Sequence, residues 1–349
     1  MKNKDTQYIV RCLQLARNGA GYVAPNPMVG AVIVHNEKII GEGYHRHYGE
    51  AHAEPNAINS VKDKSLLKES TMYVSLEPCS HVGKTPPCAD LIIACGIPRV
   101  VVGTLDPNPK VAGKGIEKLC RAGVEVEYGF LQAECRDLNK CFFTFQEKKR
   151  PYISLKWAQT RNGFIDTQRN NVKTSPLIIS NELTKLLVHK QRSENQAILI
   201  GTNTAVLDNP TLSVRHWSGR NPIRIVIDRN GRISTDSHLF DGSAQTIVYT
   251  EKVLKGTENV KFVQLNFDDH VLHNMIKSLY EHNINSVLIE GGSQILAGFI
   301  EQNLWDEARI EISPAEIENG VIAPTMPQMP IEEKGYQTHK FLFYKNSKR

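Results

Sequence analysis

The chain has 349 residues, more than one hydrophobic core usually organises, so its length predicts two domains. Apolar residues make up 40% and charged residues 23%, and no apolar run approaches the roughly 20 residues that span a bilayer. The net charge of +5, from 42 basic and 37 acidic residues, is too small to indicate a general surface for nucleic acid or membranes. The seven cysteines are odd in number and follow no signal-like segment, so we expect a reducing, cytoplasmic compartment.

Helical and strand-like patterns alternate through the first half of the chain. In chain order, we expect a helix over 8–15, strands over 29–34 and 38–41, a helix from His52, a strand over 72–76, a helix from Cys88, a strand over 99–103, a helix around 116–120 and a strand around 124–126. This order predicts a mixed α/β domain with helices covering a sheet. The polar stretch 146–151 marks a boundary, so we expect one domain over 1–148 and another over 149–349.

The second half repeats the alternation with longer apolar strands. We expect strands over 152–158, 197–201, 222–228 and 286–292, a long helix over roughly 180–194 and a shorter helix over 294–300. Buried strands that alternate with helices are typical of a largely parallel, doubly wound sheet. The fold class predicted for the whole chain is therefore α/β.

The most informative pattern is His52, Glu54 two residues later, and then Cys79 and Cys88. One His and two Cys can bind zinc and leave its fourth position open, as a catalytic zinc requires. The Glu can then move a proton between the zinc-bound water and a departing amine. This set of residues resembles the signature of zinc nucleobase deaminases, although eight residues separate the two cysteines here, where that signature has two.

Other interpretations of this pattern remain open. Any one of these residues alone is most often a packed side chain, and a structural zinc site normally has four protein ligands. A zinc-stabilised binding module without enzymatic activity predicts a fourth ligand and no loss of function when Glu54 changes. A deaminase directed at tRNA or nucleosides, with an accessory domain, predicts a basic surface or stacking aromatics, which the near-neutral first half does not favour.

Signals in the second half are weaker. The sequence Glu290-Gly291-Gly292 follows a buried strand and precedes a helix, where a ligand can approach the backbone, although a simple tight turn has the same pattern. A polar loop after the strand 197–201 contains Asp208, whose alternative role is to cap a turn. Two arginines, Arg192 and Arg215, suit phosphate, but either one alone is better explained as a solvated surface charge.

Taken together, both halves resemble the bacterial bifunctional deaminase/reductases of riboflavin biosynthesis. The segments that carry the resemblance are 25–34, 49–54, 76–88, 106–109, 202–215 and 289–293, and the eight-residue gap between the cysteines is typical of this family. The resemblance implies a cytidine-deaminase-like N-terminal domain and a dihydrofolate-reductase-like C-terminal domain. It implies zinc-dependent deamination of 2,5-diamino-6-(5-phosphoribosylamino)pyrimidin-4(3H)-one, followed by NADPH-dependent reduction of the ribosyl group to ribityl.

The resemblance also implies roles for individual residues of the first half. The zinc ligands are His52, Cys79 and Cys88, with one zinc per chain, and Glu54 is the proton donor. The residues implied to line the deaminase substrate pocket are Asn26, His45, His81 and Lys84. Partners are expected to be small phosphoribosyl pyrimidines and further copies of the chain, with no nucleic acid and no membrane.

For the second half, the resemblance implies a reductase site with separate substrate and cofactor contacts. The implied substrate contacts are Lys156, Arg192, Leu212, Arg215 and Glu290. The implied NADPH contacts are Ala158, Thr204, Asp208, Gly292, Ser293, Gln294, Ile295, Leu296, Ala297 and Gly298. Two segments depart from the family pattern: residues 167–178 lack the Trp of a Ser-x-Trp-Ile sequence, and residues 313–320 lack a double Gly.

Overall fold

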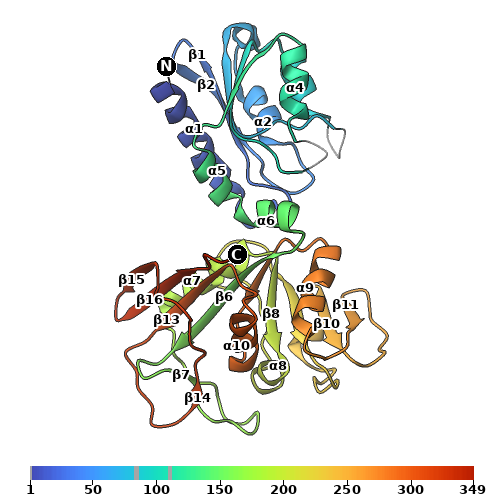
Figure 1. Ribbon diagram of the computed structural model, residues 1–349, viewed down its shortest axis with the longest axis vertical. Coiled ribbons are helices and arrows are strands. Elements are labelled where there is room, and N and C mark those ends of the chain that lie inside the picture. The colour runs from blue at the N-terminus through green and yellow to red at the C-terminus, as the bar shows by residue number, and fades with distance from the viewer. Residues whose placement is uncertain (1, 82–85, 109–111) are drawn as a thin grey trace. The chain divides into compact units, whose positions relative to one another are not determined.

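The computed structural model describes residues 2–81, 86–108 and 112–349, which divide into two compact units. The first unit covers Met1–Lys149 and the second covers Arg150–Arg349, so the division falls within the polar stretch where a boundary is predicted. Figure 1 shows that each unit contains its own sheet with helices against it. Within the described ranges, no helix is both long enough and apolar enough to cross a membrane.

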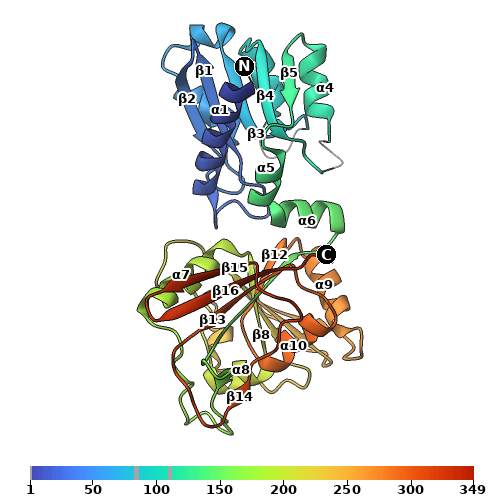
Figure 2. The same cartoon turned by 60° about the vertical axis from the view of Figure 1, so that its left-hand side comes forward.

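The first unit is built on a five-stranded sheet in the order β2-β1-β3-β4-β5. Its strands are β1 (Gly30–His35), β2 (Lys38–Tyr44), β3 (Thr71–Leu76), β4 (Arg99–Thr104) and β5 (Glu125–Tyr128). Strand β1 is antiparallel to β2 and β3, whereas β3, β4 and β5 run parallel. The carboxyl ends of β3 and β4 therefore meet at one edge of the sheet, which Figure 2 shows from a second side.

Helices cover both faces of this sheet. The helices of this unit are α1 (Lys2–Ala16), α2 (Ala53–Ser60), α3 (Cys88–Ala94), α4 (Lys114–Arg121), α5 (Gln132–Leu138) and α6 (Lys140–Lys148). Along β1, Ala31 and Ile33 join a core cluster with α2 and α3, while Val32 and Val34 join a cluster with α1. This alternation is that of a strand buried on both faces. The predicted helices and strands of this half are found, whereas α5 and α6 were not predicted.

The second unit contains a nine-stranded sheet in the order β11-β10-β9-β8-β12-β6-β13-β16-β15. The strands are β6 (Tyr152–Gln159), β8 (Ala197–Gly201), β9 (Ile223–Ile227), β10 (Thr246–Thr250), β11 (Val260–Gln264), β12 (Ser286–Ile289), β13 (Glu307–Ile312), β15 (Glu332–Tyr336) and β16 (His339–Lys345). All pairs from β11 to β13 are parallel, and only β16 pairs antiparallel with β13 and β15. The prediction of a largely parallel sheet is confirmed.

Two helices of this unit were predicted and differ from the prediction only at their ends, whereas the helices over 202–208 and 271–281 were not predicted. The four helices are α7 (Glu182–Glu194), α8 (Thr202–Asp208), α9 (Val271–Glu281) and α10 (Ser293–Glu301), and a separate pair of short strands is formed by β7 (Phe164–Asp166) and β14 (Val321–Ile322). Helix α7 starts later than predicted because the Asn181 side chain accepts a hydrogen bond from Thr184 N and caps it. Strand β12 ends at Ile289, because Gly292 has a φ of 78° and turns the chain into α10.

Candidate active sites

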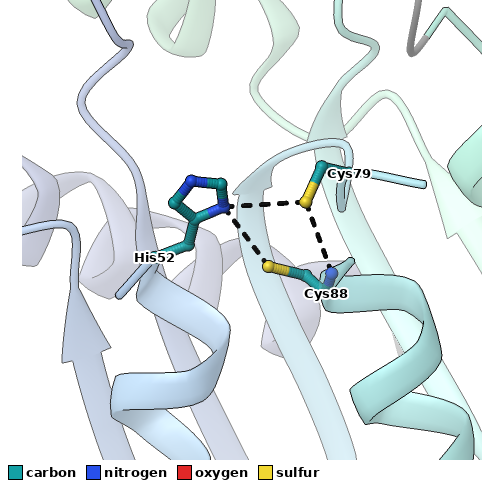
Figure 3. Close-up of side chains that lie close together, drawn as sticks. All are labelled: His52, Cys79 and Cys88. Atoms are coloured by element: carbon teal, nitrogen blue, oxygen red, sulfur yellow. Dashed lines mark hydrogen bonds between the residues drawn. The ribbon is translucent and has the colours of Figure 1, made fainter. Parts of the chain in front are cut away.

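The predicted zinc ligands come together at the edge of the first sheet where β3 ends. His52 immediately precedes α2, Cys79 follows β3, and Cys88 is the first residue of α3. The His52 Nδ1 atom lies 3.6 Å from Cys79 Sγ and 3.4 Å from Cys88 Sγ, and the Cys88 N–H donates to Cys79 Sγ at 3.3 Å (Figure 3). One strand end and two helix starts thus hold three ligand atoms in a small space.

The spacing of these atoms fits zinc. Tetrahedral zinc, with bonds of 2.0–2.1 Å to nitrogen and 2.3 Å to sulfur, places a nitrogen and a sulfur ligand about 3.6 Å apart. The two measured nitrogen–sulfur distances are close to this value, and all three ligand atoms lie within 4.8 Å of one another. Among the residues that the structure describes, this is the one His, Cys, Asp and Glu group that could hold a metal ion. It supplies three ligands, as a catalytic zinc site does.

The electrostatics of this site favour metal binding and proton transfer. A hydrogen bond from the Cys88 thiol lowers the pKa of Cys79 to about 4, and the same bond raises the pKa of Cys88. The pair therefore carries a thiolate at neutral pH, which is the form that binds metals. Burial raises the pKa of Glu54, which is only 3% exposed, to about 7. A carboxyl group with a pKa near the working pH can both accept and donate a proton.

A pocket of about 240 Å³ opens beside these residues and contains most of the predicted deaminase contacts. Asn26, His45 and His81 line it together with His52 and Glu54. The Asn26 Nδ2 atom lies 3.3 Å from His45 Nε2, and His45 Nδ1 lies 3.1 Å from the carbonyl oxygen of residue 51. Burial lowers the pKa of His45, so this ring is neutral, with its Nδ1 proton donated to that carbonyl. Lys84 lies outside the described residues.

Other lining residues were not predicted as contacts. They include Tyr48, Glu77, Asp106, Asn108 and Phe142. The motif at 106–109 was noticed in the sequence, but nothing in it indicated that Asp106 and Asn108 would share a pocket with Glu54. Phe142 belongs to α6, a helix that the sequence patterns did not indicate.

The predicted reductase residues gather at the edge of the second sheet where parallel strands end. Glu290 directly follows β12, and Lys156 lies on the neighbouring strand β6. The Glu290 carboxylate accepts three hydrogen bonds from Arg192, two from Nε at 3.0 and 3.2 Å and one from Nη2 at 2.6 Å. Burial raises the pKa of Glu290, but Arg192 and Lys156 outweigh it, so the net shift is downward. Arg192 and Glu290 thus form an ion pair, and the ammonium group of the buried Lys156 lies close enough to interact with both charges.

A second pocket, of about 380 Å³, lies against this group and is strongly basic. The predicted residues Lys156, Arg192 and Arg215 line it, and so do Lys185 and His189, which were not predicted. The ring of His189 accepts the Arg215 N–H at 3.0 Å through Nδ1, and burial lowers the pKa of His189 to about 4. The ring therefore stays neutral and orients Arg215, while the lysines and arginines suit a phosphate.

The glycine turn after β12 lies against α8 at the same sheet edge. A Cβ atom added to Gly291 would lie 3.1 Å from Thr204 Cγ2, and one added to Gly292 would lie 3.7 Å from Thr204 Oγ1. The turn thus packs closely against α8 beside the start of α10, and such strand ends and helix starts are where open α/β sheets bind dinucleotides. Of the predicted contacts over 292–298, Leu296 is fully buried and packs in the core cluster of this unit, so the structure does not expose it to a ligand. The residues here fit a cofactor such as NADPH.

Two predicted contacts of this half have other surroundings than expected. Leu212 is 4% exposed and its side chain packs in a core cluster, so it does not line the pocket. The carboxylate of Asp208, at the end of α8, accepts a hydrogen bond from Arg169 at 2.5 Å, instead of the turn-capping contact considered as its alternative. Arg169 also bonds to Asp166 at 2.7 Å, and Asp166 Oδ1 accepts the Leu177 N–H at 2.9 Å. These ionic contacts organise residues 167–178, where the family pattern has an aromatic side chain.

We predict that the purified chain binds one zinc and that Cys79→Ser or Cys88→Ser loses it, because a serine hydroxyl does not replace a thiolate ligand. Zinc content measured by atomic spectroscopy checks this. Serine variants of the five other cysteines, which are Cys12, Cys95, Cys120, Cys135 and Cys141, serve as controls and should keep the metal. Loss of zinc from any of these five variants would contradict the assignment of the ligands.

Comparisons with known proteins match both units. The family model for the cytidine and deoxycytidylate deaminase zinc-binding region matches residues 2–104, and that for the RibD C-terminal domain matches residues 151–323. The riboflavin biosynthesis protein RibD of Aquifex aeolicus is 40% identical over 94% of this chain and 92% of its own length. RibD of Escherichia coli is 35% identical, with 89% and 88% covered.

Solved structures agree over nearly the whole chain. The diaminohydroxyphosphoribosylaminopyrimidine deaminase/5-amino-6-(5-phosphoribosylamino)uracil reductase of Thermotoga maritima has a TM-score of 0.87 and 35% identity, with 99% of both chains covered. A structure of RibD from Acinetobacter baumannii has the same TM-score at 28% identity, with 98% of both chains covered. The chain therefore belongs to the RibD family of bifunctional riboflavin biosynthesis proteins, with a zinc-binding deaminase domain followed by an NADPH-dependent reductase domain.

Proposed function

We propose that this chain catalyses two consecutive steps of riboflavin biosynthesis. The first is the hydrolytic deamination of 2,5-diamino-6-(5-phosphoribosylamino)pyrimidin-4(3H)-one, and the second is the NADPH-dependent reduction of the ribosyl group of its product to ribityl. The observation that carries the proposal is the zinc-type geometry of His52, Cys79 and Cys88 in one site with the buried Glu54. The basic pocket of the second unit supports the reduction of a phosphorylated substrate.

In the deaminase domain, zinc supplies a Lewis acid that lowers the pKa of water to roughly 7 when it is bound. Glu54 accepts a proton from the attacking water and delivers it to the amine that leaves as ammonia. The Asn26 amide can read the edge of a pyrimidine, since it has both a donor and an acceptor. His45 accepts a hydrogen bond from Asn26 and so fixes the orientation of that amide.

In the reductase domain, residues at the glycine turn and the start of α10 would hold NADPH, which would supply the hydride for reduction of the ring-opened ribosyl carbonyl. Lys156 lies buried beside Glu290 and can supply the proton that turns the carbonyl oxygen into a hydroxyl. Burial lowers the pKa of Lys156 and so makes its ammonium group a better proton donor. Arg192 and Arg215 hold the phosphate of the substrate, and Glu290 keeps Arg192 in place through three hydrogen bonds.

The alternative of a tRNA- or nucleoside-directed deaminase with an accessory domain is not favoured, because the family match covers both domains. Small-molecule substrates agree with that match. We place the enzyme in the cytoplasm, since its seven cysteines are all free thiols. Ile322, Met329 and Ile331 are each at least 65% exposed within one segment, which supports a homo-oligomer that sedimentation can measure.

The direct test is incubation of the purified protein with the diaminopyrimidine ribotide, with and without NADPH, followed by mass spectrometry of the products. Without NADPH, the product should have one amine replaced by oxygen. With NADPH, it should also have gained two hydrogens. If the ribotide is left unchanged by a zinc-loaded protein, the proposed deamination is wrong.

We predict that Glu54→Gln lowers the rate of deamination by about 10²–10⁴-fold, because the amide cannot carry the proton. Zinc should remain at one per chain, since Glu54 is not among the three ligands. Steady-state ammonia release and zinc content measured on the same preparation check both points. Near-normal deamination by a zinc-loaded variant would remove Glu54 from this role.

We predict that Asp208→Asn blocks reduction and leaves deamination and zinc content intact, because the change removes a carboxylate from the reductase site alone. NADPH oxidation with the deaminated ribotide as substrate measures this. A matched control is Asp241→Asn, which breaks a carboxylate–arginine pair with Arg224 elsewhere in the same unit and should keep reduction. A folded Asp208→Asn protein with unchanged kcat and KM would contradict this prediction. It would show that Asp208 serves only in its ion pair with Arg169.

A further inference from the structure

Glu77, in the short connection between β3 and Cys79, holds an unusual number of backbone groups. It is only 4% exposed. Its Oε2 atom accepts the N–H groups of Asp106 at 3.2 Å and Gly113 at 3.0 Å. Its Oε1 atom accepts those of Gly115 at 3.0 Å and Ile116 at 3.3 Å. One buried carboxylate thus binds four backbone donors from a segment far along the chain.

These bonds use the whole acceptor capacity of the side chain. An ionised carboxylate has about four lone-pair sites, and four N–H groups occupy them here. The burial of such a charge would be costly without these partners. Glu77 also lines the deaminase pocket, yet it has no acceptor site left for a substrate. Its contribution must therefore come from what it holds in place.

Part of what Glu77 holds is the beginning of α4. The first N–H groups of a helix have no partner within the helix, and Gly113, which precedes α4, has no side chain to cap them. Glu77 supplies the missing cap for Gly115 and Ile116 from the end of β3. The position of α4 relative to β3 is thus set by this carboxylate.

An independent observation shows how closely the two segments meet. A Cβ atom added to Gly115 would lie 2.0 Å from the carbonyl oxygen of Pro78 and 3.2 Å from Glu77 Oε1. Any side chain at residue 115 would therefore push α4 away from the chain that connects Glu77 to Cys79. The sequence has glycine where the first turn of α4 rests on that connection.

The other part of what Glu77 holds is a wall of the deaminase pocket. Asp106 and Asn108 both line the pocket, and Glu77 binds the N–H of Asp106. The Asn108 N–H in turn donates to Asp106 Oδ1 at 2.7 Å. This wall follows β4, whereas the zinc ligand Cys79 follows β3. Glu77 is the side chain that joins the two.

We propose that Glu77 is a positioning residue of the deaminase site, which fixes the Asp106–Asn108 wall and the start of α4 against the strand end that carries Cys79. The inference rests on the proposed deamination. Because the Glu77 carboxylate already accepts four N–H groups, Glu77 acts through the distance between the wall and the reacting centre. A displacement of about 1 Å between such groups can reduce a rate about 10²-fold.

The first variant is Glu77→Gln, which keeps the shape of the side chain. It replaces one of the accepting oxygens by an NH2 group, which cannot accept a hydrogen bond from the backbone N–H groups. We expect kcat/KM for deamination to fall about 10–10²-fold, mostly through a higher KM, with zinc still at one per chain. Hydrogen exchange at the amides of 113–116 should become faster, which reports on the junction without any activity measurement. Reduction of the deaminated ribotide should be unchanged, because the second unit is intact.

The second variant is Gly115→Ala, which disturbs the same junction and leaves the carboxylate in place. It should raise KM for deamination in the same direction as Glu77→Gln. A matched control is Asp228→Asn in the other unit, where a carboxylate that is 3% exposed accepts the N–H groups of Arg232 and Ile233, both at 2.9 Å. This control should leave deamination unchanged.

The outcomes separate this inference from the proposed function. Absence of deamination by the unaltered enzyme would overturn the proposed function and, with it, the role of Glu77. If the unaltered enzyme deaminates while both junction variants keep its kcat and KM, the positioning role is wrong. Loss of zinc from Glu77→Gln would overturn it as well, by showing that Glu77 maintains the metal site. If Glu77→Gln does not fold, Gly115→Ala alone tests the positioning role. An unchanged KM in that variant would show that the role is wrong.

Discussion

Neighbouring strands of a parallel sheet end at the same edge, and each unit has functional side chains directly after such strand ends. In the first unit, β3 leads to Cys79 and β4 leads to Asp106. In the second unit, β12 leads to Glu290, and β8 leads into α8 with Thr204. Because the strands are buried and apolar, the first polar residues after them are held firmly at one edge. The parallel direction of the strands therefore decides which residues are brought together at each site.

The two sites use buried glutamates in opposite ways. Glu54 is buried without a cationic partner that outweighs the loss of water, so its pKa rises to about 7 and it can exchange a proton. The Glu290 side chain is also largely buried, but Arg192 binds it through three hydrogen bonds, and its pKa falls. The same side chain thus serves as a proton carrier in one unit and as a fixed anion in the other. The difference comes from the neighbouring charge.

Much of this architecture could be predicted from the sequence. Apolar runs indicated the strands that form both sheet centres, and the types and order of His52, Glu54, Cys79 and Cys88 indicated a zinc site. These signals can be recognised from residue types and their order along the chain, without knowledge of which distant segments meet. The family resemblance added the roles in the second half, of which Lys156, Arg192 and Arg215 line one pocket.

What escaped prediction depends on contacts between distant segments. No local pattern shows that Glu77 binds the N–H groups of Gly113 and Gly115, because the carboxylate and its donors are more than 30 residues apart. His189 joined the basic pocket because it lies one turn before Arg192 on α7, a relation that gives no sign of function by itself. Leu212, expected as a substrate contact, is a core residue.

The division after Lys149 gives each unit a separate hydrophobic core within one covalent chain. A cell that makes this protein therefore makes deaminase and reductase sites in equal numbers, whatever the level of expression. Any imbalance between the two steps must come from their turnover rates, since the amounts of the two catalysts cannot be adjusted separately. Accumulation of the intermediate is thereby governed by the chemistry of each site and not by gene dosage.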